Sequence, residues 1–254
     1  MLISSKDLAQ RLMRPLGFEI RRYYPHHDPW RRLLVSLERH GVNVALDVGA
    51  NVGQFAASLR RAGYTGRMIS FEPLSAAHAK LAIAARDDPL WTVAPRCALA
   101  AKSGVAEINI AANSQSSSIL DMLERHVAGD PKSAYLGREA VTTTTLDDFL
   151  DHTPDAAGAA IALKLDTQGY EAEVLAGLDK WRGNIEVIMT EISLVGLYKG
   201  EATFLDLYRM IEERGYRCIS IEPGFTDPRT SEVLQVDAIF ERDHGRGKGN
   251  ARHG

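Results

Sequence analysis

The stretch that decides the predicted fold is Val44-Ala45-Leu46-Asp47-Val48-Gly49-Ala50-Asn51-Val52-Gly53. Its short apolar run predicts a buried strand, and its glycines predict a tight turn into a helix that starts at Gln54. A dinucleotide-binding loop needs Gly-x-Gly-x-x-Gly, so that the backbone can approach a pyrophosphate. Here Asn51 takes the place of the middle glycine, and the spacing is Gly-x-x-x-Gly. The loop therefore favours a ligand without phosphates, such as one that carries an amine and a carboxylate.

Short apolar segments alternate with helical segments after this stretch, which predicts a parallel sheet covered by helices. Further strands of the sheet are expected at 68–71, 91–94, 160–166 and 185–191, and two closing strands at 218–221 and 234–240. Two more apolar arms, at 106–110 and 141–145, predict an inserted hairpin with a helix over 119–127 between them. The predicted fold class is therefore α/β, a Rossmann-like seven-stranded sheet with an inserted hairpin and an N-terminal helical cover.

The segment before this α/β region has a helical pattern. Asp28 and Pro29 form a good N-cap and first-turn pair, the stretch from Trp30 to His40 carries an apolar stripe, and Gly41 stops the helix. The predicted organisation is an N-terminal helical cover over 1–41, one α/β domain over 42–242, and a disordered tail over 243–254 that is rich in glycine and charge.

Composition limits the class of protein. The 254 residues, 45% hydrophobic and 25% charged, suit one large α/β domain with additions. A net charge of −3 gives no reason to expect a nucleic-acid partner. No apolar run reaches the ~18 residues of a membrane span, and the first residues lack the pattern of a signal peptide. Two cysteines in apolar surroundings fit a reducing compartment, so a cytoplasmic protein is expected.

An acidic residue closes the next predicted strand. Glu72 lies about twenty residues past the glycine loop, where an acid in this kind of fold takes the hydroxyls of a ribose. The loop and this acid together predict a site for an adenosine-bearing ligand. The residues that we expect to form it are Asp47, Gly49, Asn51, Gly53 and Glu72.

Several motifs, taken in order, resemble those of the FkbM-type methyltransferases. They are the loop Asp47–Gly53, Phe71-Glu72-Pro73, the serine-rich Ser114–Ser118, Thr145-Leu146-Asp147, and Leu163-Lys164-Leu165-Asp166-Thr167-Gln168-Gly169-Tyr170-Glu171. The resemblance covers roughly 41–242. It implies a class I methyltransferase domain over 42–242 that uses S-adenosyl-L-methionine, usually for O-methylation, and relatives that act on sugar hydroxyls or polyketide-type natural products. The two closing strands, 218–221 and 234–240, resemble the antiparallel hairpin edge that closes many methyltransferase sheets.

Two acids are candidates for the reacting centre. Asp166 lies at the carboxyl end of the strand over 160–166, beside the crevice where open α/β sheets bind ligands. Glu191 ends the next strand. The pair could orient the acceptor, and two carboxylates with water would also suit Mg²⁺. A helix N-cap is the structural alternative for Asp166, and a solvated surface role is the alternative for Glu191.

Methylation of a hydroxyl needs a base or a metal, because an aliphatic hydroxyl is a poor nucleophile near neutral pH. His126 follows the serine-rich stretch and is the candidate base among the histidines. Asn113, Ser116 and Ser117 are candidates to cradle the adenine or the carboxylate of the donor; a polar loop with an N-cap serine is the alternative.

The sequence therefore predicts an O-methyltransferase that acts on a hydroxyl of a sugar, a glycolipid or a natural-product glycoside. An N-methyltransferase of a small molecule remains an alternative, because the motifs indicate the methyl donor and do not identify the acceptor. An NAD(P)-dependent oxidoreductase and a binding module without turnover are the rivals from other classes. A small-molecule or glycolipid acceptor is expected as the partner, and a homodimer is left open.

Overall fold

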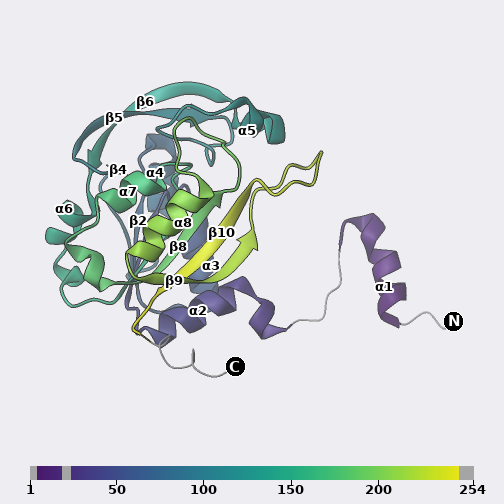
Figure 1. The fold of residues 1–254 in the computed structure, drawn as a ribbon, viewed down its shortest axis with the longest axis horizontal. Helices are drawn as coiled ribbons and strands as arrows, with labels where there is room; N and C mark the ends of the chain where they lie inside the picture. The colour runs from purple at the N-terminus through teal and green to yellow at the C-terminus, as the bar shows by residue number, and fades with distance from the viewer. Residues whose placement is uncertain (1–4, 19–23, 246–254) are drawn as a thin grey trace, which may run out of the picture.

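The structure, a computed structural model, describes residues 5–18 and 24–245 (Figure 1). Most of the tail predicted to be disordered, 246–254, lies outside the described residues. Among the helices of the described ranges, none is both long enough and apolar enough to cross a bilayer.

Seven strands form one sheet in the order β3-β2-β1-β7-β8-β10-β9. Their bounds are β1 Val44–Val48, β2 Arg67–Phe71, β3 Trp91–Val93, β7 Ile161–Leu165, β8 Ile185–Ser193, β9 Tyr216–Pro223 and β10 Gln235–Arg242. The first five strands in this order are parallel, and β10 runs antiparallel to both β8 and β9. The predicted α/β class and its antiparallel edge are confirmed.

Helices bury both faces of the sheet. The helices are α2 Pro29–Arg39, α3 Gln54–Ala62, α4 Ser75–Ala85, α6 Leu146–Asp151, α7 Glu171–Ala176 and α8 Phe204–Glu213. Alternate residues of each strand point to opposite faces. In β7, Leu163 packs in one core with residues of α6, α7 and α8, while Ala162 packs in another with residues of α2, α3 and α4. This double burial explains the nearly continuous apolar runs of the parallel strands.

The segment before the sheet divides into two parts. Helix α2 begins as predicted, because the Asp28 side chain accepts hydrogen bonds from the backbone N–H groups of Trp30 and Arg31. Its leucines 33, 34 and 37 are buried against the sheet. Helix α1, Ser5–Met13, and the short 3₁₀ turn Arg14–Leu16 contain no buried residue among the side chains described there. Within the described part of this N-terminal segment, α2 is therefore the helix that covers the sheet.

The insertion is larger than the predicted hairpin. It is a second sheet in the order β4-β6-β5, with β4 Ala98–Leu99, β5 Gly104–Ala111 and β6 Tyr135–Thr144. The predicted helix over 119–127 was wrong in its first half, because α5 spans only Glu124–Gly129. The side chain of Asn109 donates to the Leu120 carbonyl, and the Ser118 hydroxyl accepts from the Leu120 N–H. These bonds engage backbone groups that a helix would need.

A core test compares two leucines. Leu163 is fully buried in the centre of the sheet, whereas Leu136 on β6 is 75% exposed. Leu163→Ala should lower the free energy of unfolding by about 2–5 kcal/mol, because it leaves a cavity among packed side chains. Leu136→Ala should change it by less than about 0.5 kcal/mol. Urea denaturation followed by circular dichroism measures both, and equal effects would contradict the assigned core.

Candidate functional site

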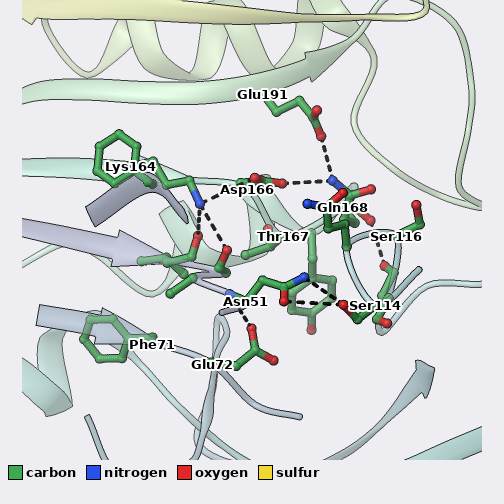
Figure 2. Close-up of a pocket in the computed structure, with 18 of the residues that line it drawn as sticks. Asn51, Phe71, Glu72, Ser114, Ser116, Lys164, Asp166, Thr167, Gln168 and Glu191 are labelled. Carbon is green, nitrogen blue, oxygen red and sulfur yellow. Dashed lines mark hydrogen bonds and ion pairs between the residues drawn. The ribbon is translucent and has the colours of Figure 1, made fainter. Parts of the chain in front are cut away.

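A cavity of about 480 Å³ opens at the carboxyl ends of β1, β2, β7 and β8, and the polar loop of the insertion forms another of its walls (Figure 2). Most of the residues predicted for the site line it. They are Gly49, Asn51, Glu72, Asn113, Ser116, Ser117, His126, Asp166 and Glu191. Two predicted donor residues, Asp47 and Gly53, do not line it.

The two glycines of the loop after β1 serve contacts inside the protein. Gly49 has φ +76°, and a Cβ there would lie 1.8 Å from the backbone oxygen of Asp166. Gly53 has φ +93°, and a Cβ there would lie 2.8 Å from the ring of Trp91. Gly49 therefore lets the ends of β1 and β7 meet, and Gly53 lets α3 start against β3. We predicted that these glycines form a tight turn and belong to the donor site; the close contacts at both positions are with other parts of the protein.

Lys164 is one of the residues of the site that the sequence reasoning missed. Its ammonium group lies 3.1 Å from Asp47 Oδ1 and 3.4 Å from Asp166 Oδ2, and it donates to the Gly49 carbonyl at 3.0 Å (Figure 2). Burial alone would lower the pKa of Lys164, but the charges of Asp47 and Asp166 reverse this and raise it above its ordinary value. A lysine inside an otherwise apolar strand run was the available signal.

Asp47 therefore supports the site from behind. Its carboxylate is 1% exposed, pairs with Lys164 and accepts a hydrogen bond from the Ser70 hydroxyl at 3.2 Å. A buried lysine without such a partner would be strongly destabilising. The acid near the end of β1 thus holds the ammonium group that faces the cavity.

Glu72 lies at the end of β2 and faces the loop after β1. Its Oε2 accepts from the Asn51 N–H and its Oε1 from the Leu74 N–H, both at 2.8 Å. Burial raises the pKa of this carboxyl, although the two N–H groups and the Lys164 charge oppose the change. Each carboxylate oxygen has two acceptor positions, so Glu72 can still accept from hydroxyls of a ligand.

The polar loop of the insertion closes over the loop after β1. Asn51 Nδ2 donates to the Ser114 hydroxyl at 3.2 Å, which links the two loops directly (Figure 2). Asn113 organises its own turn, since its amide donates to Ser116 Oγ and to Asp130 Oδ2 while its Oδ1 accepts from the Ser116 N–H. The serine-rich stretch is therefore an ordered wall of the cavity.

One amide holds the two predicted acids together. Gln168 Nε2 donates to Asp166 Oδ1 at 2.9 Å and to Glu191 Oε2 at 2.8 Å (Figure 2). Gln168 has φ +57°, an uncommon conformation for a residue with a side chain. Its own oxygen accepts from the Tyr198 hydroxyl at 2.5 Å. The acids thus sit side by side, as predicted, but the bridging glutamine and tyrosine were not foreseen.

Other carboxylates surround this pair. Asp237 of β10 also lines the cavity, and Gln235 Nε2 donates to Glu191 Oε2. Burial, followed by the charges of Asp166, Glu171 and Asp237, raises the pKa of Glu191 well above its usual value. Burial also raises the pKa of Asp237. No sequence signal tied β10 to this site, because the contact depends on the antiparallel pairing with β8.

His126 lines the cavity as predicted, but in an apolar setting. Its ring is 5.1 Å from that of Tyr198 and 5.2 Å from that of Phe225, between centroids. Its Nδ1 is buried without a hydrogen-bond partner among the described residues. Burial lowers the pKa of His126 to about 4, against a smaller opposing effect of Asp130. The imidazole is therefore neutral at every pH above about 5.

Among the described residues, one set of three possible metal ligands comes together, and it lies elsewhere. His40, Glu186 and His244 meet in a second hollow, of about 220 Å³. Arg39, Arg217 and Arg242 line the same hollow, where Arg39 and Arg217 form ion pairs with Glu241 and Arg242 pairs with Glu186. In the main cavity, Asp166 and Glu191 offer two carboxylates, which is within what Mg²⁺ uses when water completes its shell.

The chain was compared with known proteins. The family model for the methyltransferase FkbM domain matches residues 47–218. A comparison with curated protein sequences gave no significant match. The methyltransferase domain of bacterial CtHen1-C is similar in structure, with 8% identity and a TM-score of 0.45, over 86% of this chain and 99% of that one. Precorrin-6y C5,15-methyltransferase from Geobacter metallireducens GS-15 has 11% identity and a TM-score of 0.40, over 82% of this chain and 86% of that one.

The family match spans more than half of the 254 residues and includes the loop after β1, Glu72, Asp166 and Glu191. It sets aside the oxidoreductase and the binding module without turnover. The chain belongs to the FkbM methyltransferase-domain family and is an S-adenosylmethionine-dependent methyltransferase.

Proposed function

We propose that the enzyme transfers the methyl group to a hydroxyl oxygen of a sugar, a glycolipid or a natural-product glycoside. The observation that carries this proposal is the pair Asp166 and Glu191, held by the Gln168 amide inside the cavity. A carboxylate can take the proton that a hydroxyl must lose when its oxygen attacks the methyl carbon. Amide and hydroxyl side chains line much of the cavity, which suits an acceptor rich in hydroxyls.

For the donor, we propose that Glu72 accepts the ribose hydroxyls and that the loop at Gly49 and Asn51 borders the methionine part. Asn113, Ser116 and Ser117 would hold the adenine or the donor carboxylate from the opposite wall. Asp47 and Gly53 would contribute indirectly, Asp47 through the Lys164 ammonium and Gly53 through its packing on Trp91. The support is that loop, acid and polar wall share one cavity and hydrogen-bond to one another.

The donor assignment predicts a loss of affinity in Glu72→Ala. The dissociation constant for S-adenosylhomocysteine should rise by about 5- to 150-fold, which corresponds to about 1–3 kcal/mol for the lost charged acceptor. Titration calorimetry measures it. The control is Glu139→Ala, which removes a carboxylate that also binds a backbone N–H, that of Ser75, but lies outside the cavity. Unchanged affinity in Glu72→Ala would contradict the assignment of Glu72 to the ribose hydroxyls.

The chemistry at the acceptor rests on two crowded carboxylates. Because burial and the charge of Asp166 raise the pKa of Glu191, this carboxyl group exchanges a proton closer to neutral pH than a free carboxyl group does. We propose that Asp166, whose side chain is 39% exposed, meets the hydroxyl and that the pair takes its proton. Lys164 and Gln168 then keep the two carboxylates in place during transfer.

This role predicts that Asp166→Asn lowers kcat by about 10²–10⁴-fold while S-adenosylhomocysteine still binds. A base must be deprotonated to act, so kcat should rise with pH through the raised pKa of Glu191. Asp237→Asn removes one charge that raises the pKa of Glu191, and it should move this rise to lower pH. Stopped-flow or product assays from about pH 4 to about pH 9 measure this rise of kcat. The range extends about two units either side of the ordinary pKa of an imidazole, so it also covers a histidine base.

His126 remains the alternative base. Its pKa of about 4 predicts no rise of kcat near 6.5 from this residue. If His126→Ala lost 10²–10⁴-fold in kcat, the loss typical of a removed base, and Asp166→Asn kept its turnover, the base would be the histidine. A product methylated on nitrogen would replace the hydroxyl acceptor with an amine and leave the donor site unchanged.

A divalent cation is the second proposal for the acid pair. If Asp166 and Glu191 hold Mg²⁺ during turnover, exhaustive treatment with EDTA should abolish activity, and added Mg²⁺ should restore it. The control is S-adenosylhomocysteine affinity, which a metal at the acceptor side leaves unchanged. Full activity in the metal-free enzyme would show that the Lys164 charge and the hydrogen bonds from Gln168 hold the two acids without a metal.

A further inference from the structure

Helix α1 exposes an apolar face that no described part of the chain covers. Leu8, Leu12 and Leu16 are 54%, 66% and 68% exposed, and Phe18 is 61% exposed. None of the side chains described between residues 8 and 18 is buried. Figure 1 shows the helix lying apart from the sheet and its covering helices. Large side chains of this kind on a globular protein mark a surface that binds something.

Two of the exposed leucines lie on one face of α1. Leu8 and Leu12 are four residues apart in the helix, and Leu16 follows in the 3₁₀ turn. Residues four apart share a face of a helix. Arg11 and Arg14 are three apart and fall on a different flank, where both are exposed. The segment thus has an apolar stripe beside a basic one, the pattern of a helix that lies in a bilayer interface.

The charge of this segment is opposite to that of the rest of the protein. The first 24 residues contain five basic and two acidic residues, a net charge of +3, whereas the whole chain has −3. The remaining residues therefore carry −6. An excess of lysine and arginine beside exposed leucines complements an anionic lipid surface. No helix of the described ranges can span a bilayer, so the association would be at its surface.

We propose that α1 binds the surface of an anionic lipid bilayer. The leucine stripe enters the boundary between headgroups and acyl chains, and Arg11 and Arg14 lie among the lipid phosphates. Helix α2 follows in the chain, and Trp30 in its first turn lines the main cavity. A lipid-bound α1 therefore tethers the mouth of the active site near the membrane. This inference does not depend on the acceptor or on the residues assigned to catalysis.

The test is flotation of the full chain with vesicles of equal parts phosphatidylglycerol and phosphatidylcholine, and with vesicles of phosphatidylcholine alone. The wild type should float with the anionic vesicles and much less with the neutral ones. Leu12→Glu should lower the bound fraction at least about tenfold. Ile83→Glu on α4 is the matched control, because Ile83 is equally exposed at 66%. Arg11→Ser with Arg14→Ser should reduce binding to the anionic vesicles alone.

Three outcomes would overturn the proposal: no flotation of the wild type, equal flotation of Leu12→Glu, or an equal loss in Ile83→Glu. Light scattering after gel filtration measures the molar mass and tests whether α1 instead binds a second copy of the chain. That partner is indicated if the wild type does not float, is a dimer, and becomes a monomer in Leu12→Glu. Thermal unfolding with and without S-adenosylhomocysteine checks that each variant is folded and binds the donor, so that loss of flotation reports on the helix.

Discussion

The ammonium group of Lys164 lies between the ends of β1 and β7, where it meets Asp47, Asp166 and the Gly49 carbonyl. A charge buried in a protein interior is costly unless opposite charges and hydrogen bonds surround it. The partners of Lys164 come from both strand ends, so the ion cluster exists only when the two strands are in register and Gly49 permits their approach. The floor of the cavity therefore depends on this one cation.

Among the described residues that line the cavity, Lys164 is the one cationic side chain, and several carboxylates lie near it. Asp166, Glu191 and Asp237 line the cavity with Lys164, and Asp47 lies behind it. Three carboxylates near one ammonium group cannot all be ionised without cost, which is why burial and mutual repulsion raise the pKa values of Glu191 and Asp237. The donor carries a positive sulfonium group, so the acidic cavity is consistent with the donor site proposed above. Under the proposed function, the same acids would take the proton of the hydroxyl.

Gln168 fixes the positions of the neighbouring carboxylates Asp166 and Glu191 relative to each other. Its amide donates to Asp166 and Glu191, while its oxygen accepts from Tyr198 and its backbone carbonyl accepts from the Ser118 hydroxyl. The glutamine thus joins the strand ends to the polar loop of the insertion. Any movement of that loop over a bound donor would be transmitted to the acids through Gln168.

The sequence by itself determined the alternation of strands and helices, the glycine turn after β1, the acid at Glu72 and the family. These depend on local periodicity and on residue types at short spacing. Only the tertiary structure decided that Asp47 pairs with Lys164, that Gln168 joins two acids, and that His126 is buried among aromatic rings. It also replaced the first half of the predicted helix over 119–127 with an irregular segment in which Met122 forms a β-bridge with Tyr198. The reason is physical. Each of these features depends on contacts between residues that are far apart in the chain, and local sequence patterns do not determine such contacts.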